Sequence, residues 1–311
     1  MPAEGVPAAT PSQVASKAAL LHRLELDVTR RIEGVLSGAY VAYGRGPGSE
    51  RVGARRYEPG DDARRIDWNL TARTMHPHVH VTEPDRELET WFVADQSASL
   101  DFGTAEREKR ELVLAAVATF GFMAARSGNR FGLLTAGGAV IGRVPARTGR
   151  LAVLAALSWL YDAPRHESAP APGADLAAAL TQLQRTHRRR GRVGVASDFL
   201  DAGDWRTPLA HLALHHDVVA VHVVDRRELE LPDVGMLRVV DPETGRLLEV
   251  QTRSRALRDR FAAAATERRD AIRADIAGAG AACFELRTDG DWVLDVLRFL
   301  TTRTTFARTY A

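Results

Sequence analysis

The sequence predicts an α/β protein with a doubly wound, mostly parallel sheet and helices on both faces. Two observations lead to this prediction. Short apolar runs, such as 91–94 and 193–196, are typical of parallel strands that are buried on both faces. These runs alternate with longer segments of helical periodicity from residue 104 to residue 301. Strands that alternate with helices in this way form a parallel sheet with crossover helices.

The chain divides into three predicted parts. Residues 1–15 contain three prolines and almost no bulky apolar side chains, which predicts a disordered tail. Residues 16–84 form a predicted N-terminal extension, in which leucines near helical spacing indicate a helix at about 16–36. Residues 85–303 form the predicted α/β domain.

Within that domain the helices and strands follow in a regular order. The predicted helices are 105–127 with Thr104 as N-cap, 151–160, 175–188, 205–215, 255–277 and 292–301. The predicted strands are 91–94, 131–135, 140–144 as an antiparallel edge, 193–196, 218–224 and 282–286. Residues 236–251 predict an inserted β-hairpin that turns at 242–245.

The composition excludes several classes of protein. A chain of 311 residues that is 45% hydrophobic and 26% charged can bury a sizeable core. Its formal net charge of +2 favours neither a nucleic-acid nor a membrane partner. Cys283 is the single cysteine, which excludes an internal disulfide and fits a reducing compartment. The sequence shows no signal peptide, and its longest apolar run, 112–125, is too short to span a bilayer. We therefore expect a cytoplasmic protein.

Three oxygen side chains follow the first predicted strand of the domain. Asp95, Ser97 and Ser99 alternate directly after 91–94, so they lie at the carboxyl edge of the predicted sheet. Open α/β sheets bind their ligands at this edge. A carboxylate and two hydroxyls are hard ligands, which suit Mg²⁺ or Mn²⁺ better than zinc.

Two motifs carry a resemblance to a known family. The Asp-x-Ser-x-Ser at 95–99 resembles the metal-ion-dependent adhesion site of von Willebrand factor A-like domains. Residues 57–73, Tyr-Glu-Pro-Gly-Asp-Asp-Ala-Arg-Arg-Ile-Asp-Trp-Asn-Leu-Thr-Ala-Arg, resemble the signature of the bacterial family catalogued as domain of unknown function fifty-eight. Genes of that family often lie beside those of MoxR-type AAA ATPases. The likeness covers roughly residues 20 to 300, and the two motifs together make it specific.

The resemblance implies a von Willebrand factor A-like fold with three loops that converge on an ion. By position, Asp198 matches the aspartate of the third loop. The second loop usually supplies a threonine, but Ala174 stands there in Gly173-Ala174-Asp175. Water or Asp175 would have to replace that ligand, so we expect weakened binding of Mg²⁺ or Mn²⁺.

The signature segment allows two interpretations. Aspartates and arginines of opposite charge are dense in it, beside Tyr57 and Trp68: Asp61, Asp62, Asp67, Arg64 and Arg73. They could form an ion network that pins the segment to the sheet, with Trp68 as its apolar anchor. They could instead form a docking surface for a partner. Mixed charges in a compact loop usually satisfy one another, which favours the structural interpretation.

The resemblance implies a non-enzymatic protein-interaction module or adaptor, working with a MoxR-type AAA ATPase on a client protein in chaperone-like maturation. The alternative is a metal-dependent hydrolase or phosphotransferase that uses Asp95 as nucleophile. Such chemistry needs a cationic clamp on the phosphate. We expect no lysine near Asp198, because Lys109 falls inside the first helix of the domain.

Three other sites are disfavoured. An EF-hand starting at Asp95 has Leu100 where glycine is needed, and it follows a strand. The histidines at 76, 78 and 80 are interrupted by Pro77 and lack an acidic or thiol partner. The arginines of 185–192 have no interleaved aromatic side chain, so a nucleic-acid platform is not expected.

Overall fold

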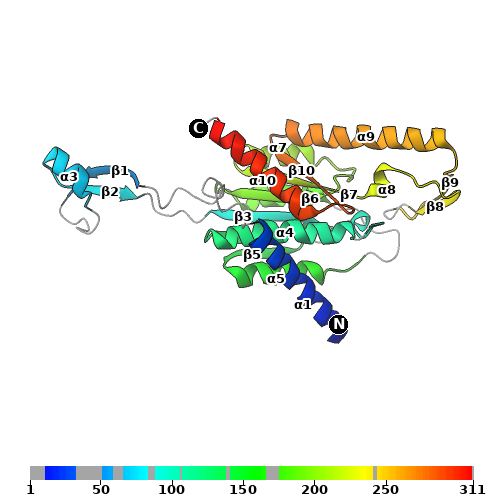
Figure 1. Cartoon of the computed structure of the whole chain (residues 1–311), viewed down its shortest axis with the longest axis horizontal. Helices are drawn as coiled ribbons and strands as arrows, with labels where there is room; N and C mark the ends of the chain where they lie inside the picture. Colours follow the sequence, from blue (N-terminus) through cyan, green and yellow to red (C-terminus); the bar gives the residue numbers. More distant parts are fainter. Residues whose placement is uncertain are drawn as a thin grey trace.

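The computed structural model describes residues 11–32, 51–58, 66–82, 88–105, 107–137, 141–165, 175–240 and 244–309. Its centre is a six-stranded sheet with the strand order β10-β7-β6-β3-β4-β5 (Figure 1). The strands are β3 Glu89–Asp95, β4 Arg130–Ala136, β5 Arg143–Thr148, β6 Arg192–Ser197, β7 Asp217–Val224 and β10 Ala282–Arg287. All neighbours pair in parallel except β5, which is antiparallel to β4. The predicted doubly wound, mostly parallel sheet is confirmed, and its antiparallel edge strand runs from Arg143 to Thr148, whereas Val140 lies outside the described residues.

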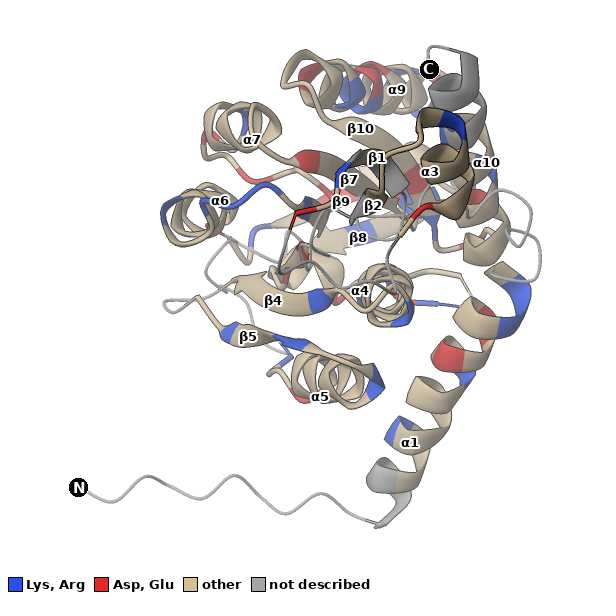
Figure 2. Ribbon diagram, turned by 90° about the vertical axis from the view of Figure 1, so that its left-hand side faces the viewer, with Lys and Arg blue, Asp and Glu red and all other residues tan. Residues whose placement is uncertain are grey.

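Helices cover both faces of this sheet. They are α1 Pro11–Leu26, α4 Lys109–Arg126, α5 Arg150–Tyr161, α6 Leu176–Thr186, α7 Arg206–Ala213, α8 Arg226–Leu229, α9 Arg255–Gly278 and α10 Trp292–Thr309. Apolar residues of α1, α4, α5 and α10 form one core cluster with the sheet, and residues of α6, α7 and α9 form the other. Figure 2, a view from the left-hand side of Figure 1, shows these two groups on opposite sides of the strands. The carboxyl ends of β3 and β6 therefore lie between two packed layers.

The first helix of the domain starts later than the sequence predicts. It begins at Lys109, with Glu108 as N-cap, and Thr104 does not cap it. The backbone N–H and the hydroxyl of Thr104 instead donate to the Asp225 carboxylate, at 2.9 and 2.6 Å. A long-range contact therefore replaces the local cap. From Leu112 to Ala124 the helix is buried on most sides, which explains why its apolar run is nearly continuous.

The N-terminal helix also differs from its prediction. α1 begins at Pro11, so residues 11–15 are helical and not disordered. Proline is favourable in the first turn of a helix, where its missing N–H would have no partner. A π-helical segment, Asp27–Ile32, continues α1, and Leu24, Val28 and Ile32 pack into the core. Residues 33–50 lie outside the described part of the chain.

Two small sheets accompany the domain. β1 Arg51–Arg56 pairs antiparallel with β2 His78–Thr82, and the helix α3 Trp68–Thr74 lies between them in sequence (left of Figure 1). β8 Met236–Val240 and β9 Leu247–Gln251 form the predicted hairpin. In the described part of the chain, no helix combines the length and the apolar character needed to cross a bilayer.

Candidate functional site

The loop after β3 turns its oxygen side chains inward. The Ser97 N–H donates to Asp95 Oδ1 at 2.7 Å, which closes a tight turn directly after the strand. A short 3₁₀ segment, Ala98–Leu100, follows and fixes the position of Ser99. Asp95 and Ser97 are each only 3% exposed. The sequence of this loop thus places a buried carboxylate and a buried hydroxyl, Asp95 and Ser97, next to the half-buried hydroxyl of Ser99.

The loop after β6 meets this turn from the neighbouring strand. The Ser197 hydroxyl donates to Asp95 Oδ2 at 2.5 Å, and the Leu200 N–H donates to Asp198 Oδ1 at 3.1 Å. Phe199 between them has a φ of 56°, which a non-glycine side chain adopts only under constraint. Its buried ring packs on Trp205 at a centroid distance of 5.0 Å, and this packing supplies the constraint.

The two loops form one connected set of oxygen atoms. Ser97 Oγ lies 2.9 Å from Ser99 Oγ, and the Ser99 hydroxyl donates to Asp198 Oδ2 at 2.6 Å. We call Asp95, Ser97, Ser99 and Asp198 the oxygen cluster. The structure thus brings together all four residues that the sequence predicts for the first and third loops. It adds Ser197, whose position one residue before Asp198 is the only signal in the sequence.

A lysine lies against this cluster, contrary to the sequence-based prediction. Lys109 Nζ donates to Asp198 Oδ2 at 2.9 Å and to Glu228 Oε1 at 2.5 Å. The prediction was wrong because the helix begins at Lys109, so this side chain belongs to the first turn and lies beneath the loops. Lys109 is fully buried. A signal was available, since Lys17 and Lys109 are the only lysines in a chain rich in arginine.

The electrostatics distinguish the two aspartates. Burial and the neighbouring Asp198 raise the pKa of Asp95 to about 7, although Ser197 and Ser97 donate hydrogen bonds to it. Burial would also raise the pKa of Asp198, but Lys109 and the Ser99 hydroxyl bring that pKa below its ordinary value. Asp198 and Glu228 in turn raise the pKa of Lys109 against the effect of burial. The cluster thus contains one carboxylate that Lys109 compensates, Asp198, and one, Asp95, that no cation contacts among the described residues.

The oxygen cluster fits a small hard cation in the kind of donor that it offers. A hollow of about 10 Å³ adjoins only Asp95 and Ser97 of the cluster; the rest of its lining is Gln96, Leu100, Asp101, Arg110, Val113 and Leu160. About 10 to 15 Å³ is the space of one water molecule. Among the described residues, no three His, Cys, Asp or Glu side chains converge as a metal site. The serine hydroxyls and water would therefore have to complete a shell of oxygen ligands, which Mg²⁺ tolerates.

Asp175 does not join the cluster. It is exposed and caps α6, where Asp175 Oδ1 accepts a hydrogen bond from the Ala178 N–H at 2.7 Å. Gly173 and Ala174 lie outside the described residues. The second loop thus supplies no ligand that the structure describes.

The signature segment forms its own small unit. Asp67 Oδ1 accepts from the N–H groups of Asn69 and Leu70, both at 3.1 Å, and thereby starts α3. The Asp67 N–H donates to the His78 carbonyl at 2.8 Å, which fastens the segment to β2 and not to the six-stranded sheet. Trp68 is 70% exposed, so its prediction as an apolar anchor was wrong: the Asp67 cap places it in the first turn of an outward-facing helix.

Tyr57 and Arg73, the other named signature residues that the structure describes, also belong to this small unit. The Tyr57 N–H donates to the Pro77 carbonyl at 2.9 Å, and Arg73 is exposed near the end of α3. Asp61, Asp62 and Arg64 lie outside the described residues. The choice between an ion network and a docking surface therefore stays open for them.

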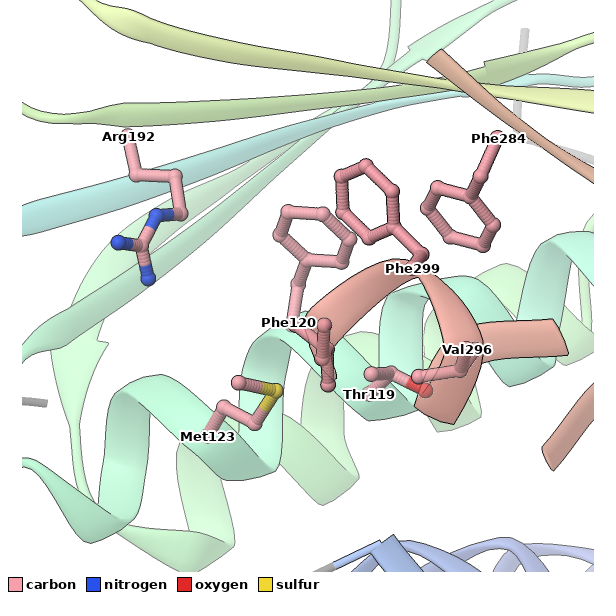
Figure 3. A pocket seen from close by; sticks show the side chains of 8 residues that line it. Thr119, Phe120, Met123, Arg192, Phe284, Val296 and Phe299 are labelled. Carbon is pink, nitrogen blue, oxygen red and sulfur yellow. The ribbon is translucent and has the colours of Figure 1, made fainter. Parts of the chain in front are cut away.

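A second hollow lies in the same helical layer as the first, between α4, α10 and the sheet. Figure 3 shows Phe284 and Phe299 beside Phe120 and Met123, with Arg192 across from them. The rings of Phe284 and Phe299 stack with a centroid distance of 4.5 Å. The hollow measures about 20 Å³. That is little more than one water molecule, at about 10 to 15 Å³ each, so it is a packing defect and not a ligand pocket.

Comparison with known proteins gives the family of the chain. The family described as "Protein of unknown function DUF58" matches residues 53–271. "Uncharacterized protein Rv1480" of Mycobacterium tuberculosis is 48% identical over 287 residues, which cover 92% of this chain and 89% of that protein. A Mycobacterium bovis relative, "Uncharacterized protein Mb1516", has the same identity and coverage.

Solved structures are similar at much lower identity. The conserved hypothetical protein BatB from Bacteroides thetaiotaomicron is 14% identical with a TM-score of 0.43, covering 70% of this chain and 98% of its own. The SpRpn10 VWA domain is 12% identical with a TM-score of 0.37, covering 69% and 94%. The family match and the identity to the mycobacterial relatives establish that the chain belongs to the DUF58 family.

Proposed function

We propose that this chain is a non-enzymatic protein-interaction module that binds a partner at the carboxyl edge of its sheet. The observation that carries the proposal is the oxygen cluster, which two loops distant in sequence build at the position where α/β sheets bind ligands. Two exposed apolar side chains flank it, one from each loop: Phe102 at 40% and Leu200 at 41% exposure. Exposed apolar side chains beside the cluster favour a protein partner, because protein interfaces cover such surface.

A divalent cation, Mg²⁺ or Mn²⁺, is part of the proposal. Asp95, Ser97, Ser99 and Asp198 would hold it, with water in place of the threonine that Ala174 replaces. Such an ion would supply positive charge for a carboxylate of the partner. The paired state of Asp198 argues for modest affinity in the free protein.

We further propose a MoxR-type AAA ATPase as the partner, with a client protein that the two mature together in the cytoplasm. This step is supported by the resemblance of the family, whose genes often lie beside those of such ATPases. The edge of the sheet and the α3 unit offer two separate surfaces, so one could face the ATPase and the other the client.

Calorimetric titration of Mg²⁺ and Mn²⁺ into metal-free protein tests the ion site. We expect binding in the wild type and its loss in Asp95→Ala, because that variant lacks the carboxylate of the first loop. Asp175→Ala is the matched control and should bind as the wild type does, since Asp175 lies outside the cluster. Equal affinity in wild type and Asp95→Ala would contradict the site. Capture of the cognate ATPase with and without Mg²⁺ would then test the partner.

Two residues of the site, Lys109 and Asp95, bear on the hydrolase alternative. Lys109 lies near Asp198, but its ammonium is buried between two carboxylates and is not available as a clamp on a phosphate. Both oxygens of Asp95 already accept hydrogen bonds, and the side chain is buried, which suits a nucleophile poorly.

We expect no turnover of a generic phosphatase substrate in the presence of Mg²⁺. A spectrophotometric assay at high protein concentration is sufficient to check this. Turnover that disappears in Asp95→Ala but persists in Asp175→Ala would overturn the non-enzymatic assignment.

A further inference from the structure

Lys109 is the one cation that contacts the carboxylates of the oxygen cluster in the described part of the chain. Its ammonium is completely buried and has two acceptors, Asp198 Oδ2 at 2.9 Å and Glu228 Oε1 at 2.5 Å. A buried ammonium is tolerated only when it is paired and hydrogen-bonded. Both carboxylates are therefore needed to keep it in this position.

The two acceptors are fixed in different ways. Asp198 belongs to the oxygen cluster, where Ser99 also donates to its Oδ2 at 2.6 Å. Glu228 belongs to α8, and its Oε2 accepts from the Asp225 N–H at 3.0 Å as part of a capping box. Asp225 is in turn held by the hydroxyls of Thr104 and Thr288, at 2.6 and 2.7 Å. Glu228 thus keeps its position whether or not Asp198 is engaged with Lys109.

The ammonium and an added cation would compete for the same atom. Asp198 Oδ2 is the oxygen that connects Asp198 to Ser99, and through it to Ser97. A dication held by these three residues would lie beside Lys109 Nζ, in a buried place where like charges repel strongly. Glu228 offers the ammonium an anchor away from the cluster.

We propose that Lys109 is the resident cation of the oxygen cluster, meaning that its ammonium occupies Asp198 in the absence of metal. A divalent ion can then coordinate Asp198 only when the ammonium leaves this carboxylate and keeps its bond to Glu228. The inference deepens the proposed function and rests on it, because it concerns the same ion site. Lys109 thereby sets the threshold for metal binding. Its release also connects the occupancy of the cluster with α8, which leads into the β8–β9 hairpin.

The first test measures Mn²⁺ affinity in charge variants of Lys109. Lys109→Met removes the ammonium and keeps an unbranched chain, and we expect at least tenfold tighter Mn²⁺ binding than in the wild type. Lys109→Arg keeps the charge and is the matched control, with affinity no tighter than wild type. Because Lys109→Met leaves the buried Asp198 and the half-buried Glu228 without a counter-charge, the pair Glu228→Gln and Lys109→Met/Glu228→Gln is measured as well. The double variant should bind at least tenfold more tightly than Glu228→Gln.

The second test follows the ammonium directly. Protein labelled with ¹⁵N at the lysine side chains gives two signals, since the chain has only Lys17 and Lys109. Lys17 pairs with Asp162, which is not part of the cluster, and serves as the internal reference. On addition of Mg²⁺, the Lys109 signal should shift with the same midpoint as the calorimetric titration, and the Lys17 signal should not.

The outcomes separate this inference from the proposed function. If the Lys109→Met variants bind Mn²⁺ and the wild type does not, the inference is supported. The native protein would then not use a metal ion in its proposed function. Wild-type binding without tightening in either variant pair, or without a shift of the Lys109 signal, overturns the inference and leaves the proposed ion site standing.

Discussion

Asp95→Asn is expected to raise the free energy of unfolding at pH 8 by about 4 kcal/mol. Burial and Asp198 raise the pKa of Asp95 from 3.8 to about 7. For a carboxyl group whose pKa is higher in the folded state, the stabilising contribution is complete below pH 3.8. It is lost as the pH rises through about 7. Asparagine keeps the shape and stays neutral, so it removes the cost of the buried charge at high pH.

Urea unfolding monitored by circular dichroism at several pH values checks this prediction. The advantage of Asp95→Asn should shrink toward zero as the pH falls to 4. Asp289→Asn is a control of opposite sign, because Arg287 holds the pKa of the Asp289 carboxyl below its ordinary value. That variant should lose stability at pH 8. An Asp95→Asn protein that is less stable than the wild type at pH 8 would contradict the assignment.

If Asp95→Asn is more stable than the wild type, the charge of Asp95 does not serve the stability of the fold. Loss of metal binding in the calorimetric titration of Asp95→Ala would then show that the carboxylate of Asp95 is present because it binds the ion. Local rules of stability are broken most often at functional sites. Asp198 shows the contrast within one cluster, because its charge is compensated by Lys109 and contributes to the fold.

The position of the site at the carboxyl edge of the sheet could be predicted because it depends on local sequence patterns. The runs 91–94 and 193–196 are apolar without alternation, as expected of central strands covered on both faces, and β3 and β6 are neighbours. Residues that follow two adjacent parallel strands must lie together. The positions of Asp95, Ser97, Ser99 and Asp198 follow from these patterns and from the family resemblance.

The rest of the site depends on contacts between distant residues. Glu228 lies in a helix of four residues, too short to give a periodic pattern, and it meets Lys109 across 119 positions. Thr104 stands directly before the predicted helix, as an N-cap would, yet its hydroxyl donates to Asp225, 121 positions away in the sequence. The prediction for Trp68 was wrong for a similar reason, because mixed charges around it fit a helix cap and an ion network equally well. Asp67 makes the cap, and Trp68 consequently faces solvent.

Asp198→Ala is expected to lower the free energy of unfolding at pH 7 by about 3 to 5 kcal/mol, because it leaves the buried Lys109 with one acceptor. Asp175→Ala removes an exposed helix cap as control and should cost about 1 kcal/mol. Chemical denaturation at pH 7 gives both values.

The double variant Lys109→Met/Asp198→Ala separates loss of pairing from loss of packing. It removes the unpaired ammonium, and the Glu228 that remains is 27% exposed along its side chain and can be hydrated. If the cost of Asp198→Ala arises from the unpaired charge, the double variant must be more stable than Asp198→Ala. A double variant that is less stable than Asp198→Ala would show that the Lys109 side chain stabilises the fold mainly by packing and not by its ion pairs. The resident-cation role would then have no energetic basis.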